Sequence, residues 1–291
     1  MILNVSGRTD IVAFYTEWFM NRYKEGYVDV RNPFYERLVS RIYFDDVDLI
    51  VFCSKNPLPI IPYIEKIDNP IIFNVTITPY HKDIEPNVPD KTDLINGVKK
   101  LSEILGKERI YIRYDPILLN KKYTVNYHIK AFSKLTKMLE GYIETIIISF
   151  VDEYKNVREH QQELNLVPFK NSDYEAIGKN FSTIAKKYSM TVQTCYENKN
   201  LVEYGFKDSP CISSKLAYQI TGKKYRKWKA RKCNCVEMVD IGQYNTCFHL
   251  CKYCYANYDE KEINNNISHH DKNSSLIIGK IKSTDIIKRR K

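Results

Sequence analysis

The chain has 291 residues, 43% of them hydrophobic, which is enough for a sizeable core and excludes disorder throughout. Its net charge of +10 favours polyanionic partners in general without identifying one. No apolar run approaches the roughly eighteen residues that span a bilayer, and the N-terminal segment has no apolar signal-peptide region. We therefore predict a cytoplasmic protein without membrane contact.

Short, nearly continuously apolar runs alternate with segments of helical periodicity, as in strands that are covered on both faces. The predicted strands are residues 2–5, 49–53, 71–77, 109–113, 145–150, 191–195 and 236–241. Helices are predicted behind Thr9 or Asp10, between Thr92 and Gly106, from 127 to 140, and behind Ser172, which would form a capping box with Glu175. The alternation predicts an α/β fold with a mainly parallel sheet, a partial or complete TIM-like (β/α) barrel.

The composition changes near residue 258. Residues 262–275 are rich in Asn, His and Lys and contain few apolar side chains. We expect one barrel-like domain over residues 1–258, including a cysteine-rich segment at 233–258, and a flexible polar tail over residues 259–291.

Polar side chains follow the predicted strands. Arg8 and Asp10 follow the first, Lys55 the second and Arg113 the fourth, while a run of cysteines follows the last. Because ligands of barrels and open α/β sheets bind at the carboxyl ends of the strands, we expect these side chains to meet at one edge.

Cys247, Cys251 and Cys254 have the spacing C-x3-C-x2-C. A 4Fe-4S cluster normally takes four thiolates, one per iron, so this loop leaves one iron for a distant ligand or for an exchangeable one. In a chain with eight cysteines, chance is a poor explanation of the spacing. His249, between the cysteines, is interpreted as a loop residue.

The triplet resembles that of radical SAM enzymes, as does the aromatic Tyr253 directly before its third cysteine. In that superfamily the triplet usually follows the first strand, so its place near the end of this chain implies a permuted core. The whole chain resembles the domain of unknown function 1848 family over roughly residues 1–258. The similarity is carried by Ser6-Gly7-Arg8-Thr9-Asp10, Lys55-Asn56-Pro57, Arg113-Tyr114-Asp115-Pro116 and the residues from Asp240 to Asn245.

The resemblance implies that Cys247, Cys251 and Cys254 hold a 4Fe-4S cluster whose open iron binds S-adenosylmethionine (SAM), with Tyr253 near the adenine. An electron donor would then drive reductive cleavage of SAM to act on an unidentified substrate, for which nucleic acid is one candidate. The SAM carboxylate would pair with one of three cations: Arg8, Lys55 or Arg113. The alternative for each cation is an ion pair with a neighbouring aspartate.

Four further cysteines could hold a second Fe-S cluster or a zinc ion, because four thiolates complete either kind of site. They are Cys195, Cys211, Cys233 and Cys235. Their scattered spacing leaves buried, unligated thiols as the alternative. Cys53 matches no cluster pattern and is predicted to be a core residue.

The segment from Lys223 to Lys232 combines seven positive residues with two aromatic ones, a mixture that is found where phosphates and unstacked bases are bound. It predicts nucleic-acid contact, and a solvated loop is the alternative.

A second functional hypothesis follows from this basic segment. In that hypothesis Cys233, Cys235, Cys251 and Cys254 bind structural zinc in a non-enzymatic nucleic-acid-binding protein. A third is an Fe-S electron-transfer protein.

Overall fold

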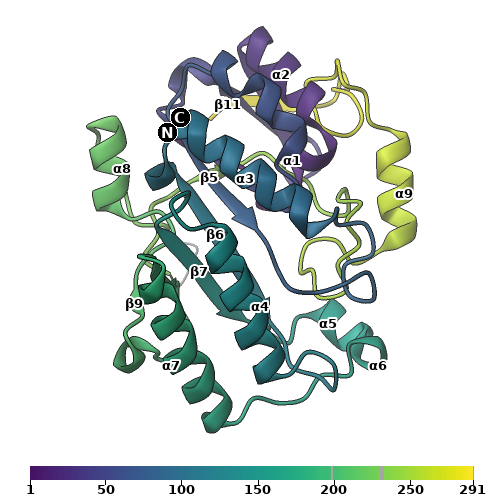
Figure 1. Cartoon of the computed structure of the whole chain (residues 1–291). Coiled ribbons are helices and arrows are strands. Elements are labelled where there is room, and N and C mark those ends of the chain that lie inside the picture. The colour runs from purple at the N-terminus through teal and green to yellow at the C-terminus, as the bar shows by residue number, and fades with distance from the viewer. Residues whose placement is uncertain (198, 230–232, 291) are drawn as a thin grey trace.

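The computed structural model describes residues 1–197, 199–229 and 233–290, and these residues form two β-sheets with helices packed against them (Figure 1). The larger sheet has eight strands in the order β10-β1-β4-β5-β6-β7-β8-β9, and each neighbouring pair is parallel. Its strands are β1 (Ile2–Val5), β4 (Leu49–Ser54), β5 (Ile71–Thr76), β6 (Ile110–Ile117), β7 (Thr145–Phe150), β8 (Thr191–Thr194), β9 (Lys207–Asp208) and β10 (Val239–Asp240).

The central strands are buried on both faces, because alternate side chains of a strand point to opposite sides of the sheet. Ile50 and Phe52 of β4 belong to the main hydrophobic core under the helices. Leu49 and Val51 of the same strand belong to a second apolar cluster, which residues of the 212–238 segment complete. Burial on both faces explains why these strands are apolar without alternation.

Helices cover one face of the larger sheet (Figure 1). They are α1 (Ile11–Phe14), α2 (Thr16–Glu25), α3 (Lys91–Leu105), α4 (Val125–Met138) and α7 (Asn171–Lys187). Phe132 of α4 and Phe181 of α7 stack with ring centroids 3.9 Å apart. The Asp10 carboxylate accepts a hydrogen bond from the backbone N–H of Ala13, which confirms Asp10 as the N-cap of α1.

Shorter elements complete the chain. The remaining α-helices are α5 (Lys155–Glu159), α6 (Gln161–Leu164), α8 (Ser214–Thr221) and α9 (Glu260–Ser268). The 3-10 helices are η1 (Phe44–Asp46), η2 (Leu58–Lys66), η3 (Lys107–Arg109) and η4 (Val202–Tyr204). In the described part of the chain, no helix has the length and apolar character needed to cross a membrane.

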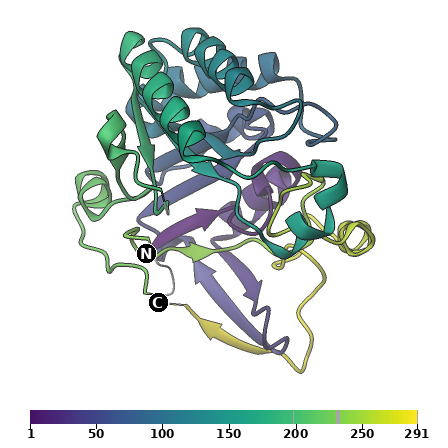
Figure 2. The same cartoon turned by 90° about the horizontal axis from the view of Figure 1, so that it is seen from below.

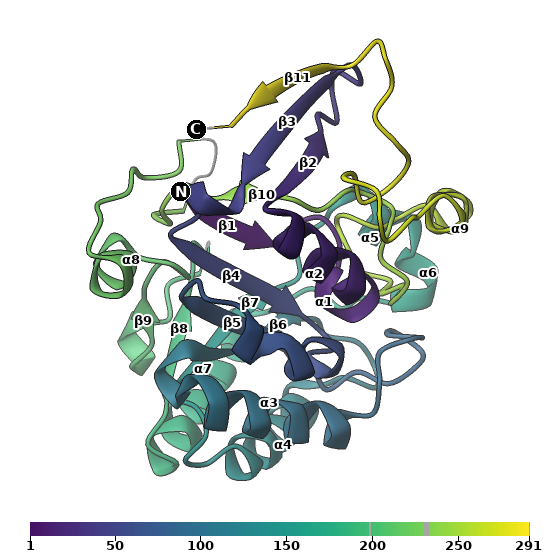
Figure 3. The same cartoon turned by 90° about the horizontal axis from the view of Figure 1, so that it is seen from above.

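The smaller sheet has the order β11-β3-β2 and projects from the larger one (Figure 3). β2 (Tyr27–Arg31) and β3 (Leu38–Tyr43) are antiparallel, and β11 (Ile286–Arg289) runs parallel to β3. Asp29 of β2 faces Arg41 of β3, and the two form a bidentate ion pair with distances of 2.8 and 2.7 Å. Figure 2 shows the C-terminal strand in yellow beside this hairpin.

The prediction of an α/β fold with a mainly parallel sheet is confirmed. Closure into a barrel stays a prediction, because β9 and β10 are the outer strands and no ladder joins them among the described residues. The predicted strand at 236–241 is shorter, since only Val239–Asp240 pair with β1. The division into a domain at 1–258 and a tail also stays a prediction.

The predicted capping box of Ser172 with Glu175 is wrong. The helix begins at Asn171, and the Asp173 carboxylate accepts a hydrogen bond from the backbone N–H of Lys170 at 2.7 Å. The Asp173 carboxylate therefore occupies the reciprocal position that was predicted for Glu175.

Residues 259–291 contain α9 and β11, although their polar composition predicts a flexible tail. Between these elements Leu276 and Ile277 are buried, and the indole N–H of Trp18 donates a hydrogen bond to the Ser274 carbonyl at 2.8 Å. The polar composition of the segment concealed these contacts, because the residues that anchor it are few.

Candidate metal centre

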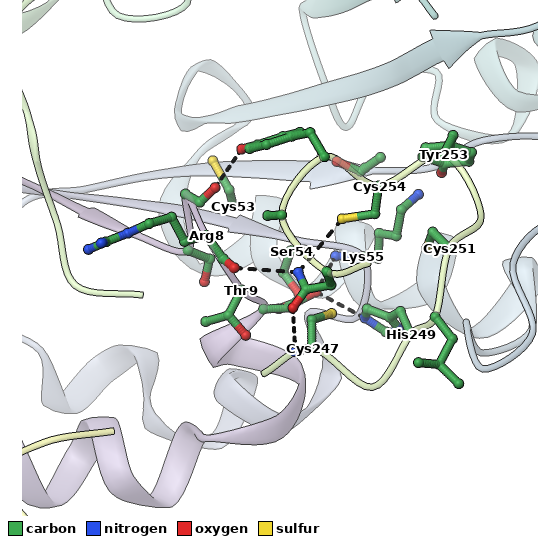
Figure 4. Close-up of a pocket in the computed structure, with 18 residues that line it drawn as sticks. Arg8, Thr9, Cys53, Ser54, Lys55, Cys247, His249, Cys251, Tyr253 and Cys254 are labelled. Carbon is green, nitrogen blue, oxygen red and sulfur yellow. Dashed lines mark hydrogen bonds and ion pairs between the residues drawn. The ribbon is translucent and has the colours of Figure 1, made fainter. Parts of the chain in front are cut away.

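The three cysteines of the C-x3-C-x2-C loop lie at the carboxyl edge of the larger sheet. β10 pairs with β1 through Val239 and Leu3, so the loop that follows β10 reaches the ends of β1 and β4. Together these segments line a cavity of about 150 Å³ that opens to solvent (Figure 4). It is lined by Ser6–Asp10, Cys53–Lys55, Thr76, Cys247, His249–Cys251 and Tyr253–Asn257.

Asn257 fixes the cysteine loop. Its side-chain oxygen accepts hydrogen bonds from the backbone N–H groups of Thr246 and Cys247, both at 2.8 Å. Its amide nitrogen lies 3.7 Å from the Cys254 Sγ. Leu250, between the first two cysteines, has a left-handed backbone with φ of 56°. The turn holds all three cysteines against one cavity.

Burial raises the pKa of the Cys247 and Cys251 thiols well above the ordinary value. The nearby Asp10 carboxylate raises the Cys247 pKa further, while the Lys55 ammonium opposes the rise at Cys251. Metal ligation requires thiolates, so a metal that binds here must displace protons from these sulfurs.

His249 is a buried residue of the site rather than a plain loop residue, and it is 2% exposed. Its Nε2 lies 3.0 Å from Asp10 Oδ2, which also accepts the backbone N–H of Lys55 at 2.8 Å. The His249 ring packs edge-on against Phe14. Its Nδ1 has no hydrogen-bond partner in the described part of the chain, and the same holds for Thr9 Oγ1.

Glu85, which sequence reasoning missed, organises the wall beside the cysteine loop. Its buried carboxylate contacts Lys55 Nζ at 2.7 Å and Lys91 Nζ at 2.6 Å. It also accepts hydrogen bonds from the hydroxyls of Thr78 and Tyr253. Burial alone would raise the pKa of Glu85, but the two lysines lower it below the ordinary value. No sequence motif marks Glu85, because it lies in an irregular loop.

The three predicted cations each have an acidic partner. Arg8 pairs with Asp240 at 3.5 Å, and Lys55 pairs with Glu85. Arg113 pairs with Asp115. Arg8 and Lys55 line the cavity, whereas Arg113 is not among its lining residues. Binding of a SAM carboxylate by any of them stays a prediction.

Tyr253 is buried beside the cavity. Its ring lies edge-on to Tyr80, and Lys55 Nζ is 5.4 Å from its centroid. The hydroxyl is held by Glu85. The placement of Tyr253 near an adenine stays a prediction.

The structure brings three of the four additional cysteines together. The sulfur atoms of Cys195, Cys211 and Cys235 all lie within 4.8 Å of one another, and Cys233 is not part of this group. Cys53 lines the cavity near the triplet, and burial raises its pKa to about 12. It is half-buried rather than a fully enclosed core residue.

The basic segment lies elsewhere. Lys223 Nζ pairs with Asp48 at 2.5 Å, and the Tyr225 hydroxyl donates to the same carboxylate at 2.9 Å. Lys224, Lys227 and Lys229 are exposed. Residues 230–232 of the segment lie outside the described residues. Its contact with nucleic acid stays a prediction.

The sequence matches the family Domain of unknown function (DUF1848) over residues 2–256. No curated protein matches it. Among solved structures it is similar to spore photoproduct lyase complexed with dinucleoside spore photoproduct, at 11% identity and a TM-score of 0.37, covering 51% of each chain. A cysteine-to-alanine mutant of spore photoproduct lyase matches at 10% identity and a TM-score of 0.45, covering 68% of this chain and 61% of that one.

A radical SAM methyltransferase from Sphaerobacter thermophilus matches at 10% identity and a TM-score of 0.31. This match covers 53% of the present chain and 41% of the methyltransferase. The chain thus spans less than two thirds of the length of each of these structures.

Proposed function

The chain belongs to the Domain of unknown function (DUF1848) family, and we propose that it is a radical SAM-type enzyme. Cys247, Cys251 and Cys254 would hold a 4Fe-4S cluster, and the iron without a cysteine would bind SAM. The observation that carries the proposal is the convergence of these three cysteines on one cavity at the carboxyl edge of a parallel sheet.

The residues that line the cavity fit such a group. Three sulfur donors come from one loop, which Asn257 holds in place. Two buried polar atoms of the lining, Thr9 Oγ1 and His249 Nδ1, have no hydrogen-bond partner among the described residues. Buried polar atoms are normally hydrogen-bonded, so these two support a polar ligand in the cavity.

When bound, the cluster would supply one-electron reductive cleavage of SAM, with the electron coming from an external donor. The chain's own residues would position the ligands. Asp10 orients His249 through its Oδ2 atom, and Glu85 holds the Lys55 ammonium and the Tyr253 hydroxyl against the loop. Lys55 would thereby keep a positive charge near Cys251, which favours the thiolate that an iron needs.

The alternative four-cysteine zinc site has no support from the geometry. Cys235 lies beside Cys195 and Cys211, whereas Cys251 and Cys254 line the cavity. A single ion bound by one cysteine pair from each place would require Cys235 to leave Cys195 and Cys211 and to approach Cys251 and Cys254.

The test is the iron and sulfide content of protein purified without oxygen, followed by EPR of the reduced form with and without SAM. We expect about four irons per chain from the triplet and a reduced signal that SAM perturbs, because SAM would bind the open iron. Cys247→Ala should abolish that perturbation.

Cys233→Ala is the matched control, since Cys233 lies outside the three-cysteine group and is not among the residues that line the cavity. It should leave the SAM effect unchanged. Absence of iron after reconstitution with iron and sulfide would overturn the proposal. A cluster whose EPR signal ignores SAM would instead indicate an electron-transfer protein.

A further inference from the structure

A second group of thiols joins the β8–β9 edge of the larger sheet to the segment that precedes β10. Cys195 follows β8, Cys211 follows β9, and Cys235 comes shortly before β10. Backbone hydrogen bonds tie the three segments together: Ser209 N–H donates to the Thr194 carbonyl, and Val236 N–H to the Ile212 carbonyl, both at 3.1 Å. We call Cys195, Cys211 and Cys235 the three-cysteine group.

The spacing of the sulfurs suits one metal ion. All three sulfur atoms lie within 4.8 Å of one another, and the Sγ atoms of Cys195 and Cys235 are 3.6 Å apart. A tetrahedral ion with Zn–S bonds of about 2.3 Å places its sulfurs about 3.8 Å apart. A cubane holds each thiolate on a different iron, which spreads the sulfurs more widely. The observed distance therefore favours a single ion over a second cluster.

The charge around the group is suited to thiolates. Arg113 Nη1 donates a hydrogen bond to the Cys211 Sγ at 3.2 Å. Three thiolates around a divalent ion carry one net negative charge, and the Arg113 guanidinium lies where it would offset that charge. Asp115 fixes the orientation of Arg113 through a salt bridge. Through this contact Arg113 would act at the three-cysteine group.

The group has three members, although structural zinc sites take four ligands. Cys233, the nearest candidate in sequence, is not part of it. The residues that the structure does not describe are Asn198, 230–232 and Lys291, and none of them is Cys, His, Asp or Glu. Cys195 and Cys211 are only partly buried, so a small ligand from solvent can approach the group.

We propose that Cys195, Cys211 and Cys235 bind one thiophilic divalent ion of the zinc type and that its fourth coordination position is open to a small exogenous ligand. Sites with three protein ligands and an exchangeable fourth position are typical of catalytic zinc. The proposal stands independently of the cluster at Cys247, Cys251 and Cys254, because the two sets share no residue.

The first experiment measures zinc and iron in the full chain purified without oxygen, for the wild type and for single cysteine variants. We expect about one zinc per chain in the wild type, as a single ion requires. Cys211→Ser should lose the zinc and keep the iron, while Cys247→Ala should lose the iron and keep the zinc. The matched control, Cys233→Ser, should keep both.

The second experiment replaces zinc with Co²⁺ and records the visible spectrum with and without imidazole. Tetrahedral cobalt with thiolate ligands gives intense d–d and sulfur-to-cobalt bands, and imidazole should shift them by entering the fourth position. A spectrum that imidazole leaves unchanged would overturn the open position. Retained iron in Cys211→Ser shows that this variant still folds.

Three results would overturn the metal site itself. One is an equal loss of zinc in Cys211→Ser and Cys233→Ser. Another is a loss of about four irons, rather than one zinc, in Cys211→Ser, which would indicate a second cluster. The third is a disulfide between Cys195 and Cys235 in protein that was never exposed to oxygen.

Discussion

Glu85 holds four polar groups on a carboxylate that has no exposed surface. Two of them are ammonium groups, of Lys55 and Lys91, and two are hydroxyls, of Thr78 and Tyr253. A buried charge is tolerated when it is paired and hydrogen-bonded, and Glu85 satisfies both conditions. The same carboxylate connects Lys55 to Tyr253, and both of these residues line the cavity.

Glu85→Gln should therefore be strongly destabilising. The substitution preserves the shape of the side chain but leaves the two lysines with no negative partner, and Lys55 is mostly buried. We expect a loss of about 3 kcal/mol in the free energy of unfolding, measured by urea titration at pH 7.

Asp83→Asn is the matched control, because Asp83 also pairs with a lysine, Lys122, but at an exposed site. It should cost less than about 1 kcal/mol. Equal losses in the two variants would contradict the role assigned to the Glu85 carboxylate.

His128 is a buried histidine with both ring nitrogens in use. Its Nδ1 lies 3.0 Å from the Tyr114 hydroxyl, and its Nε2 lies 2.9 Å from the Leu118 carbonyl oxygen. The carbonyl can only accept, so Nε2 carries the proton and Nδ1 accepts from Tyr114 in the neutral ring. Burial lowers the pKa of His128 from 6.5 to about 4.

Because the pKa of His128 is lowered in the folded chain, the free energy of unfolding should fall as the pH falls. Between pH 6.5 and about 4 the unfolded chain binds a proton at His128 that the folded chain does not, so stability is present above this window and is lost as pH falls through it. From pH 7 to pH 5 the loss should be about 2 kcal/mol.

His128→Gln should remove this part of the pH dependence, because glutamine does not titrate. The measurement is urea unfolding of both proteins at pH 7 and pH 5. If the two proteins lose the same free energy over this interval, His128 is not the group that titrates.

At the scale of elements, the sequence predicts the repeated strand–helix units and misses the hairpin inserted between two of them. The strands at 2–5 and 145–150 match β1 and β7 in their bounds, because apolar runs buried on both faces have sharp ends. The carboxyl-edge rule also places the Cys247 loop beside Arg8 and Lys55. The apolar patterns locate the strands along the chain, and the place of the Cys247 loop follows from where those strands end.

The rest depends on contacts between distant segments. The β2–β3 hairpin interrupts the alternation between β1 and β4, and its loop is longer than the two-residue turn that most strongly marks a hairpin. The same reason explains the incomplete prediction of the second sulfur site. Cys195, Cys211 and Cys235 meet only through the pairing of β8 with β9 and the return of the chain to β10, and their spacing in the sequence does not separate them from Cys233.

The C-terminal segment offers a direct test at this scale. Leu276 and Ile277 are 2% and 4% exposed, whereas Ile286 and Ile287 of β11 are 55% and 40% exposed. Removing residues 286–291 should cost about 1 kcal/mol or less. Removing residues 271–291 should cost about 4 kcal/mol, because it deletes two buried aliphatic side chains, leaves the surface they covered exposed, and deprives Trp18 of its hydrogen bond.

Thermal or urea unfolding of the two truncated chains checks this expectation. A flexible tail over its whole length would make the longer truncation as harmless as the shorter one. That result would support the tail that the composition predicts and would contradict the packing of Leu276 and Ile277.

At the scale of the whole molecule, the start of the basic segment and the cavity lie at opposite ends of the strands. Lys223 and Tyr225 bind Asp48, which also pairs with the amino group of Met1, and these residues precede β4 and β1. The cavity lies beyond the other ends of the same strands. A base that stacks on Tyr225 would therefore remain outside the cavity.

This arrangement predicts that nucleic-acid binding, if the basic segment provides it, depends on charge and not on the cysteine loop. The logarithm of the binding constant for a single-stranded oligonucleotide should fall linearly with the logarithm of the salt concentration. The slope should be about −0.7 for each phosphate that the protein neutralises. Replacing Lys224, Lys227 and Lys229 with alanine should then reduce that slope by about 2. Fluorescence anisotropy between 50 and 200 mM salt, in the range where such losses are large, measures it.

Two controls separate this prediction from general attraction to a basic protein. Replacing Lys130, Lys134 and Lys137 of α4 with alanine removes the same charge from an exposed helical face and should leave the slope unchanged. Cys247→Ala should leave it unchanged too, because the basic segment does not line the cavity. An equal slope in both lysine triple variants would show that only net charge matters, and a loss of binding in Cys247→Ala would place the nucleic acid at the cluster instead.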